Sequence, residues 1–164
     1  MTDYTAQIGL IPHPQTIVEY GIDWVTNSPV FHAVLAVSET ECMSAEPGGA
    51  RIRKISDYPD AYWSHFHLTD TQRVAIVAKA NDMLGTPYGW FADAAIAVSL
   101  KTPFRVPLWL ANYIESDKRT ECAQLCDTAY SFGGVHLFTH VLPSAVWPGM
   151  FVPVFRKNGW MPLA

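Results

Sequence analysis

The chain has 164 residues, of which 49% are hydrophobic and 13% aromatic, and its formal net charge is -4 at pH 7. A chain of this length fills one hydrophobic core, so we expect a single domain over residues 1–164. The acidic balance argues against a nucleic-acid partner, and three cysteines are too few for a disulfide framework.

The first half of the chain predicts β-strands. Residues 8–11 form a short apolar run, and residues 16–20 predict a short helix. The nearly continuous apolar run over residues 28–37 is typical of a buried strand. Further strands are predicted at 42–45, 50–55 and 62–68, so that the strand at 28–37 and these three form an antiparallel meander.

The connection Ser38-Glu39-Thr40-Glu41 is compatible with two hairpin registers. A three-residue loop places Glu46 opposite His32, with Ser44 as the diagonal neighbour. A two-residue loop places Pro47 opposite His32 instead. The sequence leaves both registers open.

The middle of the chain predicts a helix of about fourteen residues that ends near Gly85. Thr69 and Gln72 have the spacing of a capping box at its start. Apolar residues then fall on one helical face: Val74, Val77, Ala80 and Leu84.

No segment of the sequence predicts export or membrane insertion. The amino terminus lacks the basic start of a signal peptide. Residues 91–100 are apolar but too few to span a bilayer, so we expect a buried helix and no integral membrane segment. Residues 102–118 look like an insertion in which Pro107 begins a short helix.

Cys122 lies in the first turn of the next predicted helix. Thr120 is a suitable N-cap, and Gly133 is a suitable end. The positive end of the helix dipole favours a thiolate, which is the nucleophilic form of cysteine. The alternative is that Cys122 is a small buried hydrophobic residue, which we also expect of Cys42 and Cys126.

His32 is the best partner for this thiol because it interrupts an apolar strand. A buried imidazole needs a partner for each ring nitrogen, and a thiolate with one further polar group meets that need. A hydrogen-bonded core histidine is the alternative. His65 and His67 lack a third ligand, and His136 and His140 are expected at the surface, so we expect neither a metal nor another cofactor.

Five stretches in order resemble a known family: 27–35, 45–51, 85–90, 121–125 and 142–148. They are similar to the circularly permuted NlpC-like cysteine hydrolases of the papain group, which include YiiX-type and lecithin:retinol-acyltransferase-type proteins. The resemblance implies an α+β, circularly permuted papain-like fold. In that fold an antiparallel meander sheet packs against helices, and the nucleophile lies at a helix N-terminus.

The resemblance also implies residue roles. Cys122 would be the nucleophile and His32 the base. The position that orients the base falls on Ser44, twelve residues after His32, although Glu46 is the stronger acid. Tyr88 would lie beside the nucleophile.

Two tryptophans, Trp90 and Trp109, belong to an aromatic set that could line a groove for an extended substrate. The expected reaction is hydrolysis of an amide bond in a peptide or peptidoglycan stem peptide, through a thioester. One alternative is a lipid acyltransferase or thioesterase. The other is a catalytically idle binding or assembly module of a phage particle or lysis system. Without a signal peptide, we expect a cytoplasmic or virion-associated protein that meets a cell-wall substrate through a virion or lysis-machinery partner.

Overall fold

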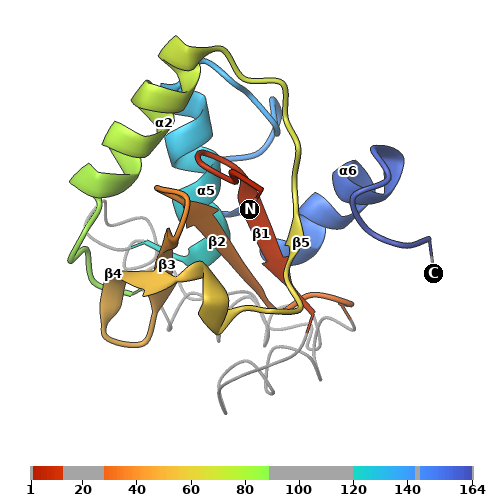
Figure 1. Cartoon of the computed structure of the whole chain (residues 1–164), viewed down its shortest axis with the longest axis horizontal. Helices are drawn as coiled ribbons and strands as arrows, with labels where there is room; N and C mark the ends of the chain where they lie inside the picture. The colour runs from red at the N-terminus through yellow and green to blue at the C-terminus, as the bar shows by residue number, and fades with distance from the viewer. Residues whose placement is uncertain (1, 13–27, 89–119, 143–144, 164) are drawn as a thin grey trace, which may run out of the picture.

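The computed structural model describes residues 2–12, 28–88, 120–142 and 145–163. Its centre is a five-stranded antiparallel sheet with the strand order β4-β3-β2-β1-β5 (Figure 1). The strands are β1 (Ile8–Ile11), β2 (His32–Ala36), β3 (Glu41–Glu46), β4 (Gly49–Lys54) and β5 (Tyr62–Trp63). With the helices described next, the sheet confirms the predicted α+β class.

Helices cover one face of this sheet. The helix α5 (Cys122–Phe132) packs on β2 and β3, and α2 (Asp70–Asp82) packs on α5 (Figure 1). A short α6 (Val152–Lys157) follows the 3-10 turn η3 (Pro148–Phe151), and another 3-10 turn, η1 (Ile55–Asp57), follows β4. None of the helices in the described part of the chain is long and apolar enough to cross a membrane.

Alternation along the strands divides the buried residues into two clusters. The larger cluster fills the space between the sheet and the helices and includes Leu10, Ala33, Leu35 and Met43 together with Cys122. The smaller cluster lies on the other face, and its buried members are Ile11, Val34, Ala36, Cys42, Tyr58 and Trp63. Successive strand residues point to opposite faces, so each strand contributes to both clusters.

The predicted meander is correct for β2, β3 and β4 but wrong for the strand after them. β5 pairs with β1 at the opposite edge of the sheet, and it covers two residues instead of 62–68. Beyond β5 the chain is hydrogen-bonded by the Gln7 side chain and not by a strand. Its Oε1 accepts from the Phe66 N–H at 2.8 Å, and its Nε2 donates to the Phe66 carbonyl at 3.1 Å.

The β2–β3 hairpin has the three-residue loop, which is the first of the two predicted registers. The Val37 N–H donates to the Glu41 carbonyl at 2.9 Å, and Val34 lies opposite Ser44. In this register Ser44 is the diagonal neighbour of His32 on the same face of the sheet.

The start of α2 matches its prediction, and its buried face matches in part. The Gln72 N–H donates to Thr69 Oγ1 at 3.2 Å, and the Thr69 N–H donates to Gln72 Oε1 at 2.9 Å. Ala80 is completely buried and Val77 packs against the larger cluster, as predicted, whereas Val74 and Leu84 are 70% and 55% exposed. α5 packs closely on α2 at the buried Ile76, since a Cβ on Gly133 would lie only 2.6 Å from Cγ1 of Ile76.

The helix α5 begins and ends near the predicted residues, but its N-cap is Glu121 and not Thr120. The Thr120 N–H instead donates to the Pro87 carbonyl at 3.0 Å, which makes Thr120 part of a β-bridge with Tyr88. Gly133 follows the last helical residue, as predicted. The predicted elements at 16–20, 91–100 and 102–118 lie outside the described residues.

We predict that alanine is tolerated less at Gly49 than at Gly48. Both have a left-handed φ, of +107° and +103°, so alanine is strained at either position. A Cβ on Gly49 would also lie 2.9 Å from the Thr86 carbonyl oxygen, whereas one on Gly48 would meet only the flexible end of Arg51. In urea unfolding, Gly49→Ala should lose about 1–3 kcal/mol more than Gly48→Ala. Equal losses would show that this close approach does not constrain the fold.

Candidate active site

The N-terminus of α5 is fixed to the sheet by backbone hydrogen bonds. The Ala50 N–H donates to the Thr86 carbonyl at 2.9 Å, and the Gly85 N–H donates to the Ala50 carbonyl at 2.8 Å. The same segment continues to Tyr88, which bridges Thr120. The chain from 85 to 88 therefore connects the start of β4 to the residues that precede Cys122.

This connection brings Cys122 and His32 to the same end of the sheet. Ala50 is paired with Ala45 on β3, the neighbour of Ser44. The Ser44 hydroxyl oxygen lies 2.7 Å from Nε2 of His32, the first residue of β2. Cys122 is itself the first residue of α5, which packs on β2.

The Cys122 and His32 side chains lie on opposite sides of β2. Cys122 is 6% exposed and belongs to the larger cluster with Ala33 and Leu35. His32 lies opposite Ile11 and shares the other face with Val34. The thiol and the imidazole can therefore meet only beyond the end of β2 that begins with His32.

The His32 imidazole is buried and neutral at neutral pH. Only 5% of the residue is exposed, and this burial lowers its pKa to about 4, against a smaller opposite effect of the Glu46 carboxylate. Ser44, which is completely buried, is its hydrogen-bond partner. The structure thus brings together two of the predicted site residues, His32 and Ser44.

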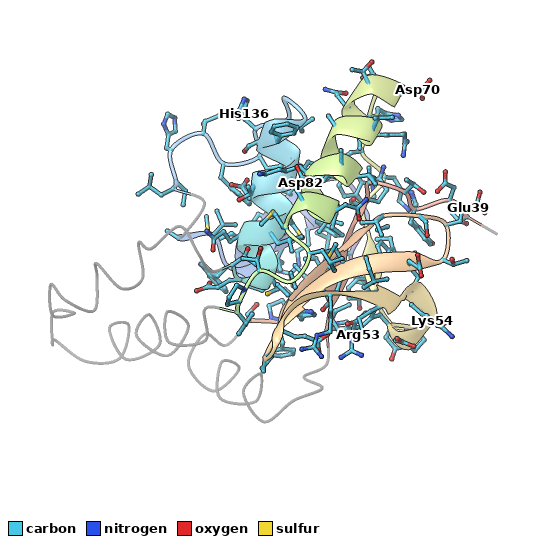
Figure 2. The ribbon with its side chains drawn as sticks, turned by 90° about the vertical axis from the view of Figure 1, so that its left-hand side faces the viewer. Glu39, Arg53, Lys54, Asp70, Asp82 and His136 are labelled. Carbon is cyan, nitrogen blue, oxygen red and sulfur yellow. The ribbon has the colours of Figure 1, made fainter. Side chains whose placement is uncertain are left out.

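Glu46 is committed to a different partner. The Arg53 guanidinium donates from Nε and Nη2 to the two carboxylate oxygens, at 2.6 and 3.0 Å. Burial acts to raise the pKa of Glu46, but the hydrogen bonds and charge of Arg53 outweigh it and lower the pKa. Arg53 lies on the side of β4 away from α2 and α5 (Figure 2). Glu46 therefore influences His32 through its charge, whereas Ser44 contacts the ring.

Tyr58 is a member of this polar group that the sequence does not indicate. Its hydroxyl donates to Ser44 Oγ at 3.3 Å, and its ring centroid lies 6.3 Å from that of His32. Tyr58 follows η1, which brings the chain back across the smaller cluster. Its closeness to His32 depends on the order of the strands, and local sequence patterns carry no signal of it.

The other predicted residues separate into three groups. Tyr88 is partly buried against the larger cluster and bridges Thr120, which places it near the start of α5. Cys42 and Cys126 are buried, as predicted, and burial raises the pKa of Cys42 to about 12 and that of Cys126 well above its usual range. Trp90 and Trp109 lie outside the described residues.

The remaining histidines do not form a metal centre with other residues of the described ranges. His65, His67, His136 and His140 are exposed, and His136 lies beyond the end of α5 (Figure 2). No group of three or more potential metal ligands occurs among the described residues.

Comparison with known proteins finds no matching family model and no matching curated sequence. The likeness to the permuted NlpC-like hydrolases consequently rests on the five sequence stretches.

We predict that the protein loses stability between pH 7 and pH 5 because of His32. The pKa of His32 is about 4 in the folded protein and 6.5 for a free imidazole. Between these pH values the unfolded chain binds a proton that the folded protein does not, so acid favours the unfolded state. The free energy of unfolding should fall by about 2 kcal/mol between roughly pH 7 and 5. Urea unfolding at both values measures this change.

The control for this prediction is the exposed His67. His32→Gln should remove most of the decrease, whereas His67→Gln should keep it. A wild-type protein whose stability is the same at both pH values would contradict a buried, neutral His32.

Proposed function

We propose that this protein is a cysteine hydrolase that cleaves an amide bond in a peptide or peptidoglycan stem peptide, with Cys122 as the nucleophile. The observation that carries the proposal is the position of Cys122. It is the first residue of an eleven-residue helix whose start is hydrogen-bonded beside the sheet end that holds His32 and Ser44. The five stretches that resemble the permuted NlpC-like hydrolases support the same roles.

In the proposed reaction the thiol proton of Cys122 moves to Nδ1 of His32, because Nε2 already contacts Ser44. The thiolate attacks the amide carbonyl carbon, and backbone N–H groups at the start of α5 bind the resulting oxyanion. The C–N bond breaks when the imidazolium returns the proton to the leaving amine. Water then hydrolyses the thioester, which releases the carboxylic acid and restores the thiol.

The electrostatics of His32 favour a neutral pair at rest. Burial keeps the imidazole unprotonated, which is the form that a general base requires. It also disfavours a resting thiolate–imidazolium pair, because the imidazolium would be a buried charge. Proton transfer in this site therefore belongs to the step in which the thiol attacks the substrate.

A second candidate is a binding or assembly module that does not catalyse. The specific observation in its favour is that Cys122 and His32 point to opposite faces of β2. A histidine that is satisfied by Ser44 and packed beside Tyr58 can be purely structural. The reactivity of Cys122 distinguishes the two candidates.

We predict that Cys122 is the reactive thiol of the folded protein and that its reactivity depends on His32. Alkylation by iodoacetamide between roughly pH 5 and 9, followed by peptide mass spectrometry, measures each cysteine separately. Cys42 and Cys126 are internal controls, since burial raises the pKa of both. In His32→Gln the rate at Cys122 should fall by about a hundredfold or more, the lower end of a general-base contribution.

The matched control variant is again His67→Gln, which should react like the wild type. If the alkylation rate of Cys122 is the same in the wild type and in His32→Gln across this pH range, the hydrolase proposal fails and the binding module takes its place. If the pair is reactive, cleavage of stem peptides by the wild type, and its loss in Cys122→Ala, tests the substrate class.

A further inference from the structure

Arg51 carries a half-exposed guanidinium on the turn that joins β3 to β4. The residue lies opposite Ser44 in the β3–β4 pairing, and 39% of its side chain is exposed. Its Nη2 donates to the Pro47 carbonyl at 2.9 Å, and a Cβ on Gly48 would collide with the same nitrogen. The guanidinium therefore rests on the Pro47–Gly48 turn.

This turn lies at the end of the sheet where the thiol and the imidazole can meet. β3 runs antiparallel to β2, so the turn after β3 lies beside the start of β2, where His32 is. Ala50 follows the turn and is hydrogen-bonded to residues 85 and 86, whose segment continues to the start of α5 at Cys122. The Arg51 guanidinium is consequently at the same end of the sheet as both proposed catalytic residues.

Two guanidinium groups share a single carboxylate here. Both oxygens of Glu46 accept from Arg53, which lies on the same face of β4 as Arg51 (Figure 2). Nε of Arg51 is 3.9 Å from Oε1 of Glu46, too far for a hydrogen bond. The group thus has an excess of one positive charge, although the chain as a whole is acidic. Among the residues that the structure describes, Arg51 Nη1 has no recorded partner, so its N–H groups remain available.

We propose that Arg51 binds a free carboxylate of the substrate, so that the peptide of the proposed function is an acidic one. A guanidinium binds a carboxylate through charge-assisted hydrogen bonds, and the Pro47 carbonyl already holds this one in place. The position of the scissile amide at Cys122 rests on the proposed function. Binding of the carboxylate does not require any activity.

The sheet sets the distance between the two points of contact. β4 is two strands away from β2, which corresponds to about 10 Å. An extended peptide spans this distance with about three residues. We therefore expect the carboxylate about two or three residues from the scissile amide. Stem peptides, which carry free carboxylates, meet this requirement, whereas the acyl chain of a lipid does not.

Binding of two matched peptides tests this proposal. One is a synthetic stem peptide with free carboxylates, and in the other these groups are carboxamides. Isothermal titration calorimetry uses the full chain with Cys122→Ala, which prevents cleavage. The carboxylate peptide should bind about tenfold more tightly or better, and Arg51→Gln should remove this preference.

Two further variants complete the experiment. Lys54→Gln removes the same charge from the other end of β4, opposite Glu41, and should keep the preference. Arg51→Lys keeps the charge but not the planar fork, so it should lose part of the preference. It tests the proposal if Arg51→Gln folds poorly.

A purely structural role for Arg51 predicts a different result. The bond to Pro47 stabilises the turn, so Arg51→Gln would then lower the free energy of unfolding and leave the preference intact. That outcome would overturn the proposal. Equal affinity for the two peptides, including no binding of either, would also overturn it.

The two readouts separate this proposal from the proposed function. If the preference depends on Arg51 but His32→Gln leaves Cys122 alkylation unchanged, the hydrolase fails and Arg51 belongs to a binding module for acidic peptides. If Cys122 depends on His32 but the two peptides bind equally, the hydrolase stands and the role of Arg51 is wrong.

Discussion

The register of the β2–β3 hairpin is the constraint on which the candidate site depends. Because the loop has three residues, Ser44 lies diagonally from His32 on one face of the sheet and can approach Nε2 within 2.7 Å. A loop shorter by one residue would move every β3 side chain to the opposite face relative to β2. Ser44 would then enter the larger cluster, and the imidazole would lose its partner. The hydrogen bond also depends on the smaller cluster, whose residues exclude water from it.

Burial of His32 has a cost that the surrounding groups offset only in part. An imidazole buried without a partner is unfavourable by a few kcal/mol, and the Ser44 hydrogen bond recovers part of this. Glu46 is close enough to favour the protonated ring, but Arg53 neutralises most of its charge. The ring is thus supported as a neutral group, which fits a general base and also fits a structural core residue.

Features that depend on neighbouring residues could be predicted from the sequence, and those that depend on distant contacts could not. The Thr69–Gln72 cap, the start of α5 at Cys122 and the strands β2 to β4 follow from local patterns. The position of β5, the exposed Val74 and the approach of Tyr58 depend on which strands and helices become neighbours. For Ser44 and Glu46 the sequence supplied the alternatives. The turn places Glu46 opposite His32, but Glu46 binds Arg53, and the diagonal neighbour Ser44 contacts the ring.

The position of Cys122 relative to the sheet depends mainly on backbone groups. The bonds from Ala50 to residues 85–86, and from Thr120 to Pro87, use only N–H and carbonyl groups, so most side-chain changes would leave them intact. The base, in contrast, is held by two hydroxyl groups that a single substitution can remove. The fold can therefore keep a cysteine at the start of α5 whether or not the chemistry is retained. It follows that the reactivity of Cys122 and its dependence on His32 decide between an enzyme and a binding module, because the overall architecture is compatible with both.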